Sequence, residues 1–572
     1  MLLTTSGDRT LFASRVALST IVVSMVALAA PEIAPVGAQE TRIPIASPAA
    51  PLALETPAAG ALSQVEHLRV KAFRFEGNTA FSGAELARVV APFLNRDISA
   101  EDLEEARRQI TLHYVNNGFI NSGALLKDQP VGNGIVTFSI VQGALQSIEV
   151  SGNRHYRSGF LQREIRQAAR APFNVARVRN ALELLRQNVN ISRINADVQP
   201  GNRPGQALLR VEVAENDPLG LSIVFDNHRP ASIGAERFSL VANHSNLTGR
   251  DDLLDLRVGL TQGGLSHGSF SGLNDLSLSY QSPFFRLPLF GARTNLLLHA
   301  AKNDAAVIEE PFRTLDISSR FENTSIGLRS LQSKTLQGET AFSVSLEHRR
   351  SRTFLSGQPF SFSRGDVNGQ AQTTALRLGE EVLKRNQSRV FAARALLSVD
   401  SGFRGSTRGA GTSDDHFVIA LGQAQYVKVL GDSGRQFLLR FNGQLASRPL
   451  LTVEQFSIGG ADSVRGYREN QLVRDSGFTA AAEMRFPVAT AKSGQNIFVL
   501  APFADFGYGA NRSSGAGADA RTLSSVGVGA IYTPGRRLNA QIYYGYPLQN
   551  IASSGNNLQD KGIHFSLVFK VL

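Results

Sequence analysis

The residues with the most informative chemistry lie in a glycine-rich segment near position 460. The sequence there reads FSIGGADSVRGYREN over residues 456–470. Its Gly-Gly pair allows a tight reversal of the chain, because glycine accepts backbone conformations that other residues avoid. The residues of interest follow this pair and are Val464, Arg465, Gly466 and Tyr467. We therefore expect a hinged loop that presents the Arg465 guanidinium, a planar group suited to bidentate contacts with carboxylates.

A second segment, further along the chain, supplies a carboxylate. It reads VLAPFADFG and contains Phe503, Asp505 and Gly507, which alternate along a predicted strand and therefore share one face. An aspartate that faced lipid would be costly, so in a membrane this face would line an aqueous interior. A contact between Arg465 and Asp505 would hold the hinged loop inside that interior. The spacing alone leaves other partners open for both side chains.

Other combinations that resemble catalytic or metal sites are better explained as turns. Gly264-Leu-Ser-His-Gly268 fits the pattern of a serine nucleophile, but it lies between two alternating runs, and the pattern requires a strand-to-helix turn. The acidic pairs Asp251-Asp252 and Asp414-Asp415 border predicted strands, where we expect solvated turn residues rather than metal ligands. The ten histidines form no pair with metal-ligand spacing on a helix. We also find no phosphate-binding loop, and so predict no catalytic residue, no metal ion, no cofactor and no enzyme activity.

From about Pro218 onward, the sequence alternates apolar and polar residues to its end. A soluble β-sandwich would also have one apolar face per strand. Here, however, charged residues stand deep within runs of about 9–11 residues, the length with which a tilted strand crosses a bilayer. In a membrane the sheet must close, because open edges would leave backbone groups without partners. We therefore predict a transmembrane β-barrel of roughly 14–18 strands over residues 217–572.

The region before the barrel contains a weak internal repeat. The strings VKAFRFEGN and LQSIEVSGN place Gly77 and Gly152 at equivalent positions, each at the end of a short predicted strand. Two helical patterns and two further strands follow in each copy. We predict two small α/β domains of order βααββ, over residues 67–143 and 144–216, with the two glycines in their turns.

The N-terminal residues are those of a secretory signal. Arg9 and Arg15 precede a short apolar run, Val16–Ala30, that ends in small residues. A transmembrane anchor would need about 20 apolar residues without interruption, more than this run provides. We therefore predict a signal peptide over residues 1–38 and a Pro/Ala-rich linker over residues 39–66.

The composition agrees with an exported chain. The 572 residues include no cysteine, which excludes thiol catalysis and zinc–cysteine sites. The formal net charge of +11 would suit an acidic partner, but the arginines are spread along the chain without a dense basic block. Since an exported protein does not meet nucleic acid, we expect no nucleic-acid partner.

The motifs VRGY and F-x-D-x-G, in this order after the repeat, resemble those of outer-membrane barrels that carry polypeptide-transport-associated (POTRA) domains. Two such units before the barrel are similar to the two-partner secretion transporters, which export haemolysins and filamentous adhesins. The strings NLTG from Asn246 and YQSPF from Tyr280 also stand where that family has similar ones. The resemblance implies about 16 antiparallel strands and a long sixth surface loop that folds into the lumen, where Arg465 meets Asp505.

The resemblance also implies a location and partners. The barrel would lie in the outer membrane of a Gram-negative cell, with the POTRA domains in the periplasm. These domains would capture a large, unfolded, β-rich exoprotein through their sheet edges, and the barrel would pass it to the cell surface or medium. Other expected partners are outer-membrane lipid and, during biogenesis, the barrel-assembly machinery.

Some features depart from the family pattern, and two other functions stay open. The chain ends in Leu572 rather than in an aromatic residue, so its assembly signal is atypical. Residues 39–64 are too rich in proline to favour the pore-plugging helix of some members. The main alternative function is assembly or insertion of other outer-membrane proteins, although those relatives usually carry three or more POTRA units. A plain diffusion porin would lack the repeat.

Overall fold

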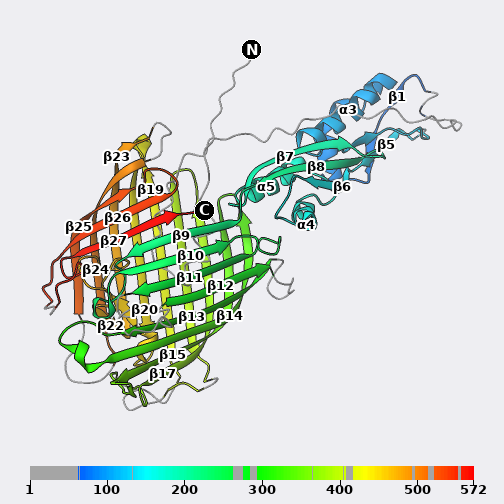
Figure 1. Cartoon of the computed structure of the whole chain (residues 1–572). Helices are drawn as coiled ribbons and strands as arrows, with labels where there is room; N and C mark the ends of the chain where they lie inside the picture. Colours follow the sequence, from blue (N-terminus) through cyan, green and yellow to red (C-terminus); the bar gives the residue numbers. More distant parts are fainter. Residues whose placement is uncertain are drawn as a thin grey trace. The chain divides into compact units, whose positions relative to one another are not determined.

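Figure 1 shows the computed structural model of the whole chain. The structure describes Leu62 and residues 65–131, 133–261, 275–283, 293–363, 365–402, 405–407, 416–491, 496–512, 521–551 and 555–572. The predicted signal peptide and most of the predicted linker lie outside these residues. Contacts divide the chain into two units, one over Ala38–Asn216 and one that contains Asp217–Leu572.

The N-terminal unit contains the order βααββ twice, and the first copy has in addition a two-stranded sheet of the short strands β1 (Leu68–Arg69) and β3 (Asp97–Ile98) (Figure 1). The rest of the first copy consists of β2 (Ala72–Glu76), α2 (Gly83–Val89), α3 (Ala100–Asn116), β4 (Gly123–Leu125) and β5 (Ile135–Val141). The second consists of β6 (Ala144–Ser151), α4 (Ser158–Ala168), α5 (Val175–Arg186), β7 (Ile191–Pro200) and β8 (Gln206–Glu215). The sheets have the orders β2-β5-β4 and β6-β8-β7, and in each the first strand runs parallel to the last. In the described parts of the chain, no helix is long and apolar enough to cross a membrane.

The two turn glycines occupy equivalent places in the two copies. Gly77 and Gly152 have φ angles of +83° and +78°, a region that residues with a Cβ rarely adopt. A Cβ at Gly77 would lie 2.7 Å from the carbonyl oxygen of Ile140, and one at Gly152 would lie 2.5 Å from that of Val213. Both carbonyls belong to the last strand of their copy. The glycine therefore lets the turn close against the central strand of each sheet.

The second unit is a closed barrel of 16 antiparallel strands, which confirms the predicted fold class (Figure 1). The strands are β9 (Leu219–Asp226), β10 (Arg237–His244), β11 (Leu253–Thr261), β12 (Asp275–Pro283), β13 (Thr294–Ala306), β14 (Ile317–Thr335), β15 (Gly338–Leu355), β17 (Gln370–Arg385), β18 (Arg389–Asp400), β19 (Val418–Leu430), β20 (Arg435–Ala446), β23 (Ser476–Thr490), β24 (Asn496–Ala510), β25 (Arg521–Tyr532), β26 (Leu538–Pro547) and β27 (Ile563–Lys570). The two-residue strand β16 (Gln358–Pro359) pairs antiparallel with the end of β15. The last strand, β27, pairs with the first, β9, and closes the sheet.

The barrel has two distinct rims and two distinct faces. We call the rim where β9 begins, at Leu219, the proximal rim, and the opposite one the distal rim. Outward positions carry exposed apolar side chains such as Leu240 and Ile326, whereas inward positions carry buried polar ones such as Arg377 and Asp505. This is the distribution expected when lipid surrounds the barrel and water or polar groups fill it.

Candidate functional site

The segment between β20 and β23, residues 447–475, starts at the distal rim and turns back into the barrel; we call it the lumen loop. It contains a 3-10 turn, η7 (Thr452–Glu454), and an antiparallel hairpin of β21 (Phe456–Ile458) and β22 (Leu472–Arg474). It contacts inward side chains of β15 and β17 and also those of β24 and β26, strands well separated in the barrel order. The lumen loop therefore crosses the interior.

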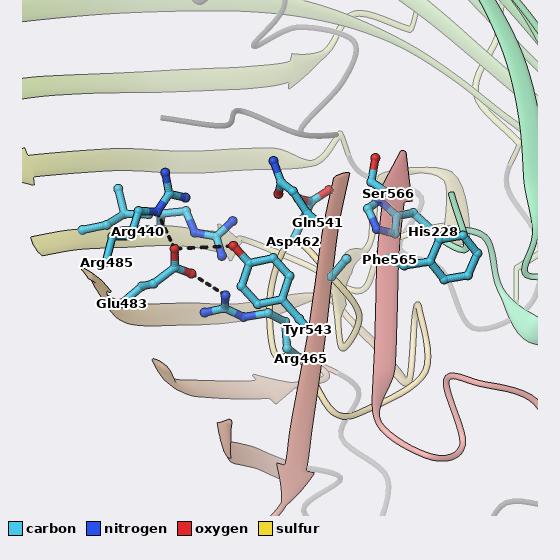
Figure 2. Close-up of a pocket in the computed structure, with 12 residues that line it drawn as sticks. His228, Arg440, Asp462, Arg465, Glu483, Arg485, Gln541, Tyr543, Phe565 and Ser566 are labelled. Atoms are coloured by element: carbon cyan, nitrogen blue, oxygen red, sulfur yellow. Dashed lines mark hydrogen bonds and ion pairs between the residues drawn. The ribbon is translucent and has the colours of Figure 1, made fainter. Parts of the chain in front are cut away.

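At the tip of the hairpin, Arg465 contacts Asp505 on β24. Its Nε and Nη2 donate to Asp505 Oδ2 and Oδ1, both at 2.8 Å, and its backbone N–H donates to Oδ2 at 3.0 Å. The remaining guanidinium nitrogen, Nη1, donates to Glu483 on β23 (Figure 2). Both carboxylates are almost fully buried, and Arg465 itself is 2% exposed. The structure thus brings together the two charged residues of the sequence motifs and adds a second acid.

Aromatic rings enclose the guanidinium on its remaining sides. The Arg465 Cζ lies 3.6 Å from the ring centroid of Phe503 and 4.8 Å from that of Tyr543 on β26. Figure 2 shows Arg465, Glu483 and Tyr543 together, as part of the lining of a pocket inside the barrel. A cation over a desolvated aromatic face is stabilised by about 2 kcal/mol or more. Phe503 and Asp505 of the F-x-D-x-G motif therefore both contact the Arg465 guanidinium.

The two glycines of the motifs provide the space for this contact. A Cβ at Gly507 would lie 2.5 Å from Ile458 Cγ2 and 2.9 Å from Val464 Cγ2, both on the lumen loop. A Cβ at Gly466 would lie 2.8 Å from the carbonyl oxygen of Gly545 on β26. With any larger residue at these positions, the loop would be pushed away from the wall.

Val464 and Tyr467 complete the attachment. Val464 is fully buried in an apolar cluster that includes Ile458 and Leu523. The Tyr467 hydroxyl donates to the carbonyl oxygen of Ser524 at 2.9 Å and accepts from the backbone N–H of Gln549 at 3.0 Å. All four residues of the VRGY motif are thus in contact with the barrel wall or with its distal loops.

A second attachment lies at the base of the lumen loop, where the sequence motifs gave no signal. Glu454 is 4% exposed and accepts from Arg377 at 3.0 and 3.1 Å, from Thr373 at 2.8 Å and from Arg349 at 3.3 Å. Arg377 and Arg349 also pair with Glu347, so four charged groups share this part of the wall. The loop is therefore tied to β15 and β17 as well as to β24.

A third attachment joins the lumen loop to two distal loops. Arg468 makes paired contacts with Asp560 at 2.6 and 2.9 Å and with Glu309 at 2.6 and 3.0 Å. Glu309 lies between β13 and β14, and Asp560 lies between β26 and β27. Two bidentate pairs on one arginine form a geometrically specific clamp. These contacts, like those of Glu454, depend on residues far apart in the sequence.

Comparison with known proteins decides what kind of barrel this is. Residues 205–531 match the haemolysin secretion/activation protein family ShlB/FhaC/HecB, and residues 68–143 match the ShlB-type POTRA domain. The chain belongs to the haemolysin secretion/activation family. This confirms the predicted family and identifies the first βααββ unit as a POTRA domain, and it favours a secretion transporter over the assembly factor that the sequence left open.

Two curated transporters resemble the chain over most of its length. The outer membrane transporter CdiB of Dickeya dadantii (strain 3937) is 21% identical over 494 residues, which cover 84% of this chain and 82% of the relative. The heme/hemopexin transporter protein HuxB of Haemophilus influenzae (strain 86-028NP) is 21% identical over 484 residues, which cover 82% and 81%. The solved structure of CdiB from Escherichia coli has the same fold, with a TM-score of 0.64 at 18% identity over 90% of this chain and 92% of that chain.

The family strings NLTG and YQSPF meet at the proximal rim, around Asp252. This aspartate is fully buried and accepts from the backbone N–H of Thr248 at 2.9 Å and from the Tyr280 hydroxyl at 2.9 Å. The prediction of a solvated turn residue is therefore wrong for Asp252, because alternation does not reveal a partner on the next hairpin. Gly264-Leu-Ser-His-Gly268 and Asp414-Asp415 lie outside the described residues. Within the described residues, no group of three His, Asp or Glu side chains is placed to hold a metal ion.

Proposed function

We propose that this protein is the outer-membrane translocator of a two-partner secretion pair. It takes up an unfolded exoprotein in the periplasm and passes it through the barrel to the cell surface or medium. The observation that carries the proposal is the match of residues 205–531 to the haemolysin secretion/activation family. The family consists of transporters, and we propose that this chain performs no catalysis and needs no cofactor.

The POTRA domains are the proposed site of capture. Each sheet has two edge strands, β2 and β4 in the first copy and β6 and β7 in the second. An edge strand presents unpaired backbone N–H and C=O groups, which an extended chain can pair with by adding a strand. Such pairing reads the backbone rather than a specific side chain, so it suits a long, unfolded exoprotein. The barrel-assembly machinery and the surrounding outer-membrane lipid are the remaining proposed partners.

The lumen loop is the proposed gate. It crosses the interior and is held by Arg465, Glu454 and Arg468, so we propose that it must leave the wall while a chain is in transit. The VRGY residues and Phe503, Asp505 and Gly507 form the fastening at its tip. We propose that this fastening keeps the loop in one position until the exoprotein arrives.

Deletion of the gene tests the proposed function. The culture medium should lose one large, β-rich exoprotein, while the amounts of other outer-membrane barrels stay unchanged. A general loss of outer-membrane barrels would instead indicate an assembly factor. Increased uptake of small solutes as the only change would indicate a porin.

A further inference from the structure

Six charged side chains gather on the outer surface of the barrel near the distal rim. They lie on three neighbouring strands and form what we call the rim patch: Lys302 and Asp304 on β13, Arg320 and Glu322 on β14, and Arg350 and Arg352 on β15. Each is separated by an even number of residues from Leu298, Ile326 or Leu346 on its own strand. Leu298 and Ile326 are exposed apolar residues. Since every second residue of a strand points to the same side, the rim patch faces outward like these apolar residues.

The strand register arranges the rim patch in two rows. Glu322 stands between Lys302 and Arg350 in one row, and Arg320 stands between Asp304 and Arg352 in the next. Leu346 precedes Arg350 by four residues and Arg352 by six, which corresponds to roughly 13 and 20 Å of strand. With a strand tilt of about 40°, both rows lie above the apolar band, at the level of lipid headgroups.

Among the described strand residues, outward charge at the distal rim is confined to this sector of the barrel. At the distal rim, the outward strand positions described on the other strands are apolar, aromatic or uncharged polar residues. Exposed examples are Phe225, Phe238, Val418, Leu445, Phe478, Tyr508 and Tyr546. An even ring of charge would be a general feature of a barrel at the interface, whereas a patch on three strands indicates a particular contact.

The rim patch has an excess of positive charge that its own acids do not balance. It contains four cations and two carboxylates. Asp304 contacts Lys302 at 3.2 Å and Arg320 at 3.4 Å, and its side chain remains partly exposed. Arg320 and Arg352 stand directly opposite each other across two strands, an arrangement that destabilises a sheet when the charges are alike. Arg350 donates through Nη2 to the neutral Gln370 Oε1 at 2.8 Å, a contact that does not balance its charge. A bound anion would relieve these features.

We propose that the rim patch binds the phosphate groups of a glycolipid in the outer leaflet. The guanidinium fork matches phosphate oxygens in a bidentate manner, and three arginines on adjacent strands present several forks to one headgroup. The outward direction and the height above the apolar band select a lipid headgroup over a soluble phosphate. This inference rests on the proposed outer-membrane location, in which the distal rim faces the cell surface because the chain passes from the periplasmic domains into β9 at the proximal rim. It is independent of what the barrel exports.

Binding of lipid A to the full-length protein in detergent micelles tests the proposal, with native mass spectrometry as the readout. Wild-type protein should bind bisphosphorylated lipid A at least about tenfold more tightly than dephosphorylated lipid A, because several cations act on one anionic headgroup. The triple variant Lys302→Gln, Arg350→Gln, Arg352→Gln should lose this preference. Equal binding of the two lipids by wild-type protein would overturn the proposal without any variant.

A matched control removes the same charge from the proximal rim. Lys384, Arg389 and Lys428 lie there on outward positions of β17, β18 and β19, and their change to glutamine should leave the preference for phosphate intact. An equal loss in this control would overturn the proposal. Export of the partner should continue in both variants. Loss of export with unchanged lipid binding in the distal variant would assign the rim patch to the exported chain instead.

Discussion

At the scale of the residue, Arg465 belongs to a network of buried charged side chains, and removal of any one of them would leave another charge without its partner. Its guanidinium faces Asp505 and Glu483, and Glu483 also accepts from Arg485 at 2.7 Å. Because these charges are buried, loss of one partner leaves the others desolvated and unpaired, which typically costs about 3–5 kcal/mol. Arg465 can make this contact only while the lumen loop lies against the wall. The free energy of the contact therefore stabilises that position of the loop.

We predict that Arg465→Ala lowers export of the partner at least about tenfold, because the loop tip no longer has a fixed position in the lumen. The protein should still reach the outer membrane as a barrel, since the sixteen strands pair without this residue. The amount of partner in the medium and the heat-dependent gel mobility of the barrel measure the two effects. Arg474→Ala, on the same hairpin, is the matched control. Normal export by the Arg465→Ala variant would refute the proposed role.

The sequence predicted part of this site for a clear physical reason. Arg465 and Asp505 could be paired in advance because each belongs to a recognisable motif, and because an inward carboxylate needs a cation. Glu483 and Tyr543 could not, because alternation assigns them only to the inward face, and their neighbours come from other strands. Which inward residues meet depends on barrel closure and on register, and neither is encoded in a short segment.

At the scale of the element, the lumen loop is held at its base as well as at its tip. Glu454 lies on the short turn η7 and accepts from Arg377, Arg349 and Thr373 on β15 and β17. A hydrogen bond to a charged group contributes about 1.5–3 kcal/mol, so this base attachment is comparable to the one at the tip. Nothing in the sequence around Glu454 marks it, because a single acid in a loop has the appearance of a solvated residue.

We predict that Glu454→Gln raises the open probability of the pore in planar bilayers by about tenfold. The amide keeps the shape of the side chain but lacks the charge that holds two arginines, and about 1.4 kcal/mol of weakening corresponds to this factor. Glu380→Gln, on the exposed face of the same strand as Arg377, should leave the conductance unchanged. An unaltered open probability in the Glu454→Gln variant would show that the base does not hold the loop.

The equivalent turn glycines make a second prediction for the elements. Gly77→Val should loosen the first POTRA copy, because a Cβ there would lie 2.7 Å from the Ile140 carbonyl oxygen at a φ of +83°. Hydrogen exchange of the full chain should show faster exchange in β2 and β5, with a loss of about 1–3 kcal/mol of local stability. Gly83→Val, at a position with open space, is the control. Unchanged protection of β5 would contradict the assigned role of the turn.

At the scale of the whole molecule, the order of the elements was easier to predict than their extent. Alternation identified a barrel and the repeat identified two βααββ copies, because both are periodic features of the sequence. The strands of the barrel vary from eight residues in β9 to 19 in β14, and this variation was not predictable. Strand length depends on pairing with neighbours, and β14 extends because both β13 and β15 continue beside it beyond the apolar band.

The division into two units predicts that capture and passage can be separated. Deletion of residues 68–142 should abolish binding of the N-terminal segment of the partner to the purified protein, since it removes both edges of the first POTRA sheet. The barrel should remain folded, because its strands pair only with one another. Unchanged binding by the shortened protein would place capture elsewhere in the chain.

For export, the tip of the lumen loop must leave the barrel wall, and a reversible cross-link between the two tests this requirement most directly. The chain has no cysteine, so Val464→Cys with Gly507→Cys introduces a single thiol pair. A Cβ at Gly507 would lie 2.9 Å from Val464 Cγ2, a separation suited to a disulfide, and Ile458→Ala makes room for it. Export should stop in the oxidised protein and return when a reductant opens the bond. Equal export in both states, with the cross-link shown to be complete, would contradict the account.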